Sequence, residues 1–279
     1  MRRLLLMLLL LPALWSGVPP AAPQRVVSQT VGTDDLLLAL AAPGQIAALS
    51  HLAQDERYSP SFREARKHPH LANSDAEAVL RFRPDLVIAT SYTEAEVLNL
   101  LRRAKVNLLI LERYETLQDL YANARRIGKA LGREARAEEL IRQWQARVEA
   151  LRVKLQGVKP VRVLAVGLYP FTAGAGTTFQ DLCEHAGALN VAAEAGLKGH
   201  APTPGEQVLS WRTEVLVAPG EPGFDMKARL LELPPYKFLP ALKQGRLVEL
   251  PGSLMAATSQ ARIDGYEQLA RALHPERFK

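Results

Sequence analysis

Aromatic and imidazole side chains follow the expected strands of this sequence, and their chemistry suits ligand binding. Aromatic rings offer a large apolar surface, and an imidazole or a tyrosine phenolate can ligate haem iron. Several such groups around one cleft would bind a large, flat and partly apolar metal chelate. For any single residue, packing within its own domain remains the alternative. The set comprises His51, Tyr58, Tyr92, Arg113, Tyr114, Tyr169, Phe171, His200, Phe224 and Met255.

The sequence offers little for nucleophilic or phosphate chemistry. Cys183 and His185 stand two residues apart in an expected helix, so their side chains point to different faces. Gly174 and Gly176 fit neither the G-x-G-x-x-G nor the P-loop spacing. We therefore assign no catalytic residue and predict that the protein is not an enzyme, with an enzyme on the same fold as the weaker alternative.

A site for a free Zn²⁺ or Mn²⁺ ion is a further alternative. Such a site needs three or four converging His, Asp or Glu side chains. His68 and His70 form a short H-x-H motif around Pro69, and no His-rich loop accompanies it. We therefore assign no metal ligand and expect no resident cofactor.

Short apolar runs that alternate with helical patterns would position the candidate ligand-binding groups. The expected strands are nearly continuous in apolar residues, which is typical of parallel sheets covered by helices on both faces. Ligands of such sheets bind outside the carboxyl ends of the strands, where the set above lies. We expect strands at 25–28, 46–49, 85–89, 106–111, 161–166, 215–218 and 247–250, helices at 36–40 (capped by Thr33 or Asp34), 75–82, 94–104, 178–186 and 259–273, and a helical turn at 206–211.

A long amphipathic helix is expected between the two halves. Apolar residues recur at three- and four-residue steps from Arg133 to Leu155, while Arg and Glu occupy the opposite face. Such a helix would be about 35 Å long and could join two lobes; an ordinary surface helix within one domain is the alternative. The predicted fold is α/β, with an N-terminal lobe at 23–132, an inter-lobe helix at 133–156 and a C-terminal lobe at 157–279.

The N-terminus and the charge pattern indicate an exported protein. Arg2 and Arg3 precede an apolar run and then small residues up to Ala22, so residues 1–22 are predicted to be a signal peptide. The only cysteine is Cys183, so no cysteine is present to carry a lipid anchor, and we expect a free periplasmic protein. The net charge is +6, but acidic and basic residues are interspersed, which argues against nucleic-acid binding.

Several segments together resemble the periplasmic binding proteins for cobalamin, ferric siderophores and haem. The resemblance implies two lobes joined by a helix with a ligand cleft between them, little hinge motion, a monomer, and delivery of the ligand to the membrane subunits of an ABC importer. It leaves cobalamin, a ferric siderophore and haem open as ligands. The matching segments are 75–88, 127–133, 137–141, 171–179, 186–193, 206–209 and 273–278.

The resemblance also implies roles for single residues. Glu77 and Glu206 match the glutamates that pair with arginines of the transporter, although a favourable interaction with a helix N-terminus is their alternative role. Arg262 matches an arginine that often faces the cleft. Leu71 and His200 stand where cobalamin binders carry tryptophans, which weakens that ligand. The predicted ligand-binding residues are His51, Tyr92, Tyr114, Tyr169, Phe171, His200 and Arg262.

Overall fold

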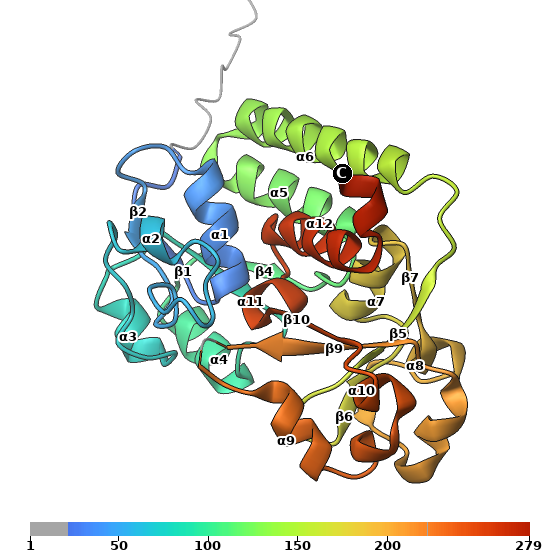
Figure 1. Ribbon diagram of the computed structural model, residues 1–279. Coiled ribbons are helices and arrows are strands. Elements are labelled where there is room, and N and C mark those ends of the chain that lie inside the picture. The colour runs from blue at the N-terminus through green and yellow to red at the C-terminus, as the bar shows by residue number, and fades with distance from the viewer. Residues whose placement is uncertain (1–21, 222) are drawn as a thin grey trace, which may run out of the picture.

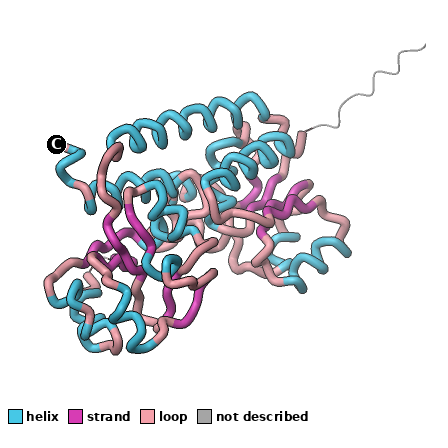
Figure 2. The backbone as a smooth tube through the Cα atoms, turned by 90° about the vertical axis from the view of Figure 1, so that its right-hand side faces the viewer, coloured by secondary structure: helices cyan, strands magenta, loops and turns pink. Residues whose placement is uncertain are grey.

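A computed structural model describes residues 22–221 and 223–279 of the chain. It contains two separate parallel sheets flanked by helices (Figures 1 and 2). The predicted two-lobed α/β fold is confirmed. Residues 1–21 of the predicted signal peptide lie outside the described residues. Within the described ranges, no helix combines the length and the apolar character needed to cross a membrane.

The N-terminal lobe is built on a four-stranded parallel sheet in the order β2-β1-β3-β4. Val26 and Val27 show how the sheet is covered, because successive side chains of a strand point to opposite faces. Val26 packs in the core with α1 and α5, whereas Val27 packs with α3 and α4. The elements are β1 (Val26–Ser28), α1 (Val31–Leu40), β2 (Ile46–Ala48), α2 (Phe62–Ala65), α3 (Ala76–Leu80), β3 (Leu86–Thr90), α4 (Ala95–Arg103), β4 (Leu108–Leu111) and α5 (Leu117–Leu131).

The C-terminal lobe repeats this plan with the strand order β10-β9-β5-β7. A small antiparallel pair, β6 with β8, is added beside this sheet and was not predicted. The strands are β5 (Val161–Ala165), β6 (Phe171–Ala173), β7 (Ala188–Asn190), β8 (His200–Pro202), β9 (Val215–Gly220) and β10 (Leu247–Pro251). The helices are α7 (Thr178–His185), α8 (Val191–Glu194), η1 (Gly205–Trp211), α9 (Met226–Glu232), η2 (Tyr236–Phe238), α10 (Pro240–Lys243), α11 (Gly252–Met255), α12 (Ala261–Leu273) and η3 (Pro275–Phe278).

Helix α6 (Glu134–Lys154) runs across both lobes along one side of the molecule (Figure 1). It packs against α5 of the first lobe and against α7 and α12 of the second. Near its start, Arg136 donates to the carbonyl of Ala39 in α1. Further along, Arg147 forms ion pairs with Asp264 and Glu267 of α12. The expectation of a helix that joins the lobes is therefore met, and the alternative of a helix within one domain is wrong.

Helix α1 begins earlier than the sequence pattern predicted. Its N-cap is Thr30, whose hydroxyl accepts from the Thr33 backbone N–H, so the predicted cap at Thr33 or Asp34 is wrong. Asp34 instead lies fully buried and accepts hydrogen bonds from Ser50. The cap was misplaced because a buried carboxylate within an apolar run resembles a capping residue when its distant partner is unknown.

Candidate functional site

Two adjoining cavities lie at the carboxyl ends of the strands. Cavity 1, of about 590 Å³, is lined by both lobes, and cavity 2, of about 410 Å³, is lined by the C-terminal lobe. Glu221, Gly252 and Ala256 line both, so the two cavities adjoin, and together they are called the cleft. Each volume falls within the range of small-molecule sites.

Cavity 1 has a polar first-lobe wall that faces a loop of the second lobe. His51, Tyr58 and Tyr92 line it, and the rings of Tyr58 and Tyr92 are half exposed. The second-lobe loop approaches α1 closely, since a Cβ at Gly32 would lie 1.9 Å from Thr258 Oγ1. Glycine therefore permits the contact between the lobes that forms this end of the cavity.

Cavity 2 has an aromatic wall built on the β6–β8 pair. Phe171 and His200 lie on one face of this pair. His200 of β8 is paired with Ala173 of β6, and Phe171 shares the face of Ala173 because side chains two positions apart on a strand point the same way. Tyr169 is 80% exposed and Phe171 is 52% exposed, although both rings line the cavity. Phe224 and Met255 complete the apolar lining. The two strands have only three residues each, which explains why no sequence pattern revealed them.

Tyr114 and Arg113 line neither cavity. The ring of Tyr114 meets the ring of Tyr92 edge-on, with centroids 5.2 Å apart and an interplanar angle of 87°. Burial raises the pKa of the Tyr114 hydroxyl. Arg113 pairs with Asp119 at 3.2 Å. Tyr114 therefore contacts Tyr92, which lines cavity 1, but does not line the cavity itself.

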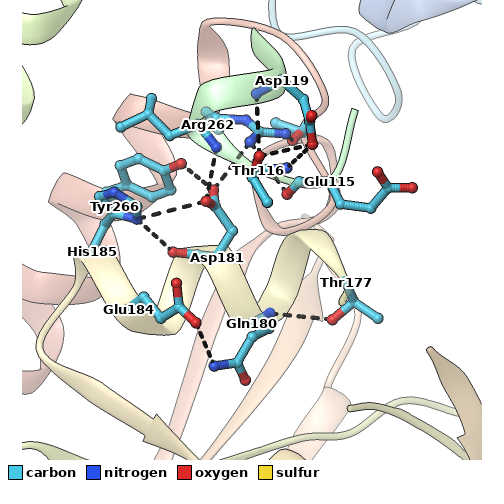
Figure 3. Close-up of polar contacts among 12 residues, drawn as sticks. Glu115, Thr116, Asp119, Thr177, Gln180, Asp181, Glu184, His185, Arg262 and Tyr266 are labelled. Atoms are coloured by element: carbon cyan, nitrogen blue, oxygen red, sulfur yellow. Dashed lines mark hydrogen bonds and ion pairs between the residues drawn. The ribbon is translucent and has the colours of Figure 1, made fainter. Parts of the chain in front are cut away.

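Arg262 does not face the cleft, so that prediction is wrong. Its side chain is 3% exposed and pairs with Asp181 of α7 at 3.1 Å (Figure 3). The same guanidinium donates to the carbonyls of Tyr114, Glu115 and Ala257. The sequence showed an arginine at the start of a helix, but its partner Asp181 is 81 positions away and could not be assigned.

A second buried contact between the lobes was also missed. The Ser259 hydroxyl donates to Asp35 Oδ2 over 2.6 Å, and the Gln260 amide donates to the Asp35 carbonyl over 3.0 Å. Burial raises the pKa of Asp35 to about 6 and that of Asp34 to about 7. The sequence did contain one indication that these carboxyl groups are buried, because Asp34 and Asp35 directly precede the apolar residues of the helix.

The two predicted docking glutamates are exposed and line neither cavity. Glu77 lies in the first turn of α3, where Asp75 is the N-cap, and it pairs with Arg81 at 2.7 Å. Glu206 lies in the first turn of η1. Their role in docking stays a prediction.

Other candidate chemistry has less support in the geometry. Cys183 is fully buried, and burial raises the pKa of its thiol well above the usual value. Within residues 22–221 and 223–279, no group of three or more His, Cys, Asp or Glu side chains could hold a metal ion.

Comparison with known proteins places this site in a familiar architecture. The periplasmic binding protein profile matches residues 26–254. An uncharacterized ABC transporter substrate-binding lipoprotein of Bacillus subtilis, YvrC, is 20% identical over 267 residues, which cover 92% of this chain and 82% of the relative. The molybdate-binding protein MolA of Haemophilus influenzae is 25% identical over 248 residues, which cover 80% of this chain and 70% of the relative.

Solved structures share the fold over nearly the whole chain. The periplasmic haem-binding protein RhuT from Roseiflexus sp. RS-1 has a TM-score of 0.79 at 24% identity, with 91% of this chain and 99% of RhuT covered. The vitamin B12-binding protein BtuF of Vibrio cholerae has a TM-score of 0.72 at 18% identity, with 92% and 99% covered. At these identities the similarity establishes the fold.

Proposed function

The chain belongs to the periplasmic binding protein family, and we propose that it captures a bulky metal chelate for an ABC importer. The observation that carries this proposal is the cleft formed by the adjoining cavities 1 and 2. One end presents His51 and Tyr92 from the first lobe, and the other presents Tyr169, Phe171 and His200 from the second. A ligand that fills both ends therefore contacts both lobes.

The chemistry of the lining favours a large and partly apolar ligand. Phe171, Phe224 and Met255 offer apolar surface, while His51 and His200 place an imidazole at each end. Rings of this kind pack against flat ligands, and imidazole can coordinate iron. Ferric haem, a ferric siderophore and cobalamin are the chelates that fit this description. The haem- and vitamin B12-binding proteins of the same fold support this class.

We extend the proposal to partners and location. The protein would act in the periplasm as a monomer and without catalytic activity of its own. Glu77 and Glu206, exposed and one on each lobe, would pair with arginines of the permease. Charge pairs at such a transient interface fix the orientation of the partners and speed their encounter.

Isothermal titration of the purified mature chain tests the proposal. The titrants are ferric haem, cyanocobalamin, a ferric siderophore, molybdate and Zn²⁺. We expect saturable binding of one chelate at one per chain. Saturation by Zn²⁺ or molybdate alone would refute the chelate proposal and favour the metal-ion or oxyanion class.

A matched pair of variants locates the binding site. Phe171 and Phe238 are both 52% exposed, but only Phe171 lines the cleft. Phe171→Ala should weaken chelate binding about tenfold, because the ring contributes on the order of 1.5 kcal/mol of apolar contact. Phe238→Ala should leave the affinity unchanged. Equal effects of the two variants would place the ligand elsewhere.

A further inference from the structure

The buried side chain of Arg262 makes four hydrogen bonds close to the cleft. Its Nη2 donates to the Tyr114 carbonyl over 2.6 Å and to the Ala257 carbonyl over 3.2 Å. Its Nη1 donates to Asp181 Oδ2 over 3.1 Å and to the Glu115 carbonyl over 3.3 Å. One guanidinium therefore joins both lobes.

Asp181 makes this buried charge tolerable and adds a second link between the lobes. Its Oδ1 accepts from the backbone N–H of Leu117, at the start of α5, over 2.9 Å. The Tyr266 hydroxyl donates to Oδ2 (Figure 3). Both oxygens of the carboxylate are bonded, which offsets part of the cost of burying this ion pair, whereas Nε of Arg262 has no hydrogen-bond partner among the described residues. Arg262 and Asp181 thus hold the segment from Tyr114 to Leu117 against the second lobe.

The segment from Tyr114 to Leu117 supports the wall of cavity 1 that contains Tyr92. The ring of Tyr114 packs edge-on against the ring of Tyr92, and Tyr92 lines cavity 1. Ala257, whose carbonyl also bonds to Arg262, lines the same cavity from the second lobe. A shift of the Arg262 guanidinium would therefore move two parts of the lining of cavity 1, one from each lobe.

We propose that Arg262 is a positioning residue for ligand binding, which fixes the separation of the Tyr92 and Ala257 walls of cavity 1. It acts through the Tyr114 carbonyl and touches no ligand itself. The planar guanidinium is suited to this because it directs several N–H groups at fixed angles, which an ammonium group cannot do. The effect on affinity rests on the proposed function, whereas the ordering of the Tyr114 segment does not.

Two variants separate positioning from general stabilisation. Arg262→Lys keeps a positive charge beside Asp181 but loses the fork that bonds both carbonyls. Tyr266→Phe removes a donor from the same Asp181 without touching the Tyr114 carbonyl, and it is the matched control. In hydrogen-exchange mass spectrometry, Arg262→Lys should speed the amide exchange of residues 112–117 about tenfold. This factor corresponds to the free energy of one lost charge-assisted hydrogen bond. Tyr266→Phe should change this exchange less than about twofold.

Ferric haem is the ligand probe for the second measurement. Arg262→Lys should weaken haem binding about tenfold in the native background and by less in a Tyr92→Ala background, where only the Ala257 wall remains to be displaced. Persistence of the full loss without the Tyr92 ring would overturn the proposal, as would equal exchange rates in the two single variants. If haem does not bind the native protein, the proposed function fails for haem, and the exchange measurement alone decides on positioning.

Discussion

The buried carboxyl of Asp34 should make the stability of the protein fall as pH rises. The side chain has no exposed surface, and its two oxygens accept from the Ser50 backbone N–H and hydroxyl. Burial disfavours the charged form and raises the pKa from 3.8 to about 7, with a smaller contribution from the neighbouring Asp35. The hydrogen bonds from Ser50 oppose this shift but do not cancel it.

The sign follows from proton binding in the two states. Between about pH 4 and pH 7 the folded state keeps the Asp34 proton, whereas the unfolded state releases it. The stabilising contribution is therefore complete below pH 4 and is lost as pH rises towards 7. A shift from 3.8 to about 7, at 1.36 kcal/mol for each pKa unit, corresponds to about 4 kcal/mol.

Asp34→Asn isolates this contribution, because an amide can accept from the Ser50 N–H, donate to the Ser50 hydroxyl and never ionise. Urea unfolding from pH 4 to pH 8 should show the stability of the variant gaining about 4 kcal/mol on that of the native protein. Asp55→Asn is the control, since Asp55 is only part-buried and its pKa lies near 2 beside Arg57. Parallel pH curves for the native protein and Asp34→Asn would refute the reasoning.

Three further outcomes are expected. Replacing Glu77 and Glu206 together with Ala should abolish uptake in cells that carry the cognate permease but leave the ligand Kd unchanged; loss of ligand binding would contradict the docking role. Arg147→Met should lower the free energy of unfolding by less than about 1 kcal/mol, because its ion pairs are partly exposed. A much larger loss, measured by urea unfolding, would contradict this and show that the two ion pairs are needed to hold α6 in place. Cys183 should react with a thiol reagent only as fast as the protein unfolds, since the thiol is buried and its pKa is raised; rapid labelling of native protein would count against that burial.

Elements that are defined by residues close together in the sequence could be predicted from the sequence. The apolar run from Leu86 to Ala89 forms most of β3, whose residues are buried on both faces of the sheet. The amphipathic pattern after Gly132 forms α6, and Gly132 ends α5 in the left-handed conformation at φ 67°. In each case the residues that define the element are within a few turns of one another.

Features that depend on distant partners could not be predicted. Phe171 and His200 share a face only because β6 pairs with β8. The placement of Arg262 depends on Asp181, and that of Asp35 on Ser259, 224 positions away. The candidate cleft aromatics were found because strand ends converge in any parallel sheet. The side-chain directions required the tertiary contacts.

The connection between the lobes favours a preformed cleft over a large closing motion. One continuous core runs from Val26 in the first sheet to Val163 in the second, through α5, α6 and α12. Opening the lobes would expose part of this core and would also break the buried Asp35–Ser259 and Arg262–Tyr114 hydrogen bonds. Each lost hydrogen bond costs on the order of 0.5–1.5 kcal/mol, because water replaces the protein partner when the lobes open. Selectivity must therefore come from the shape and lining of cavities 1 and 2 as they already stand, with side chains such as Tyr169 making the final adjustment.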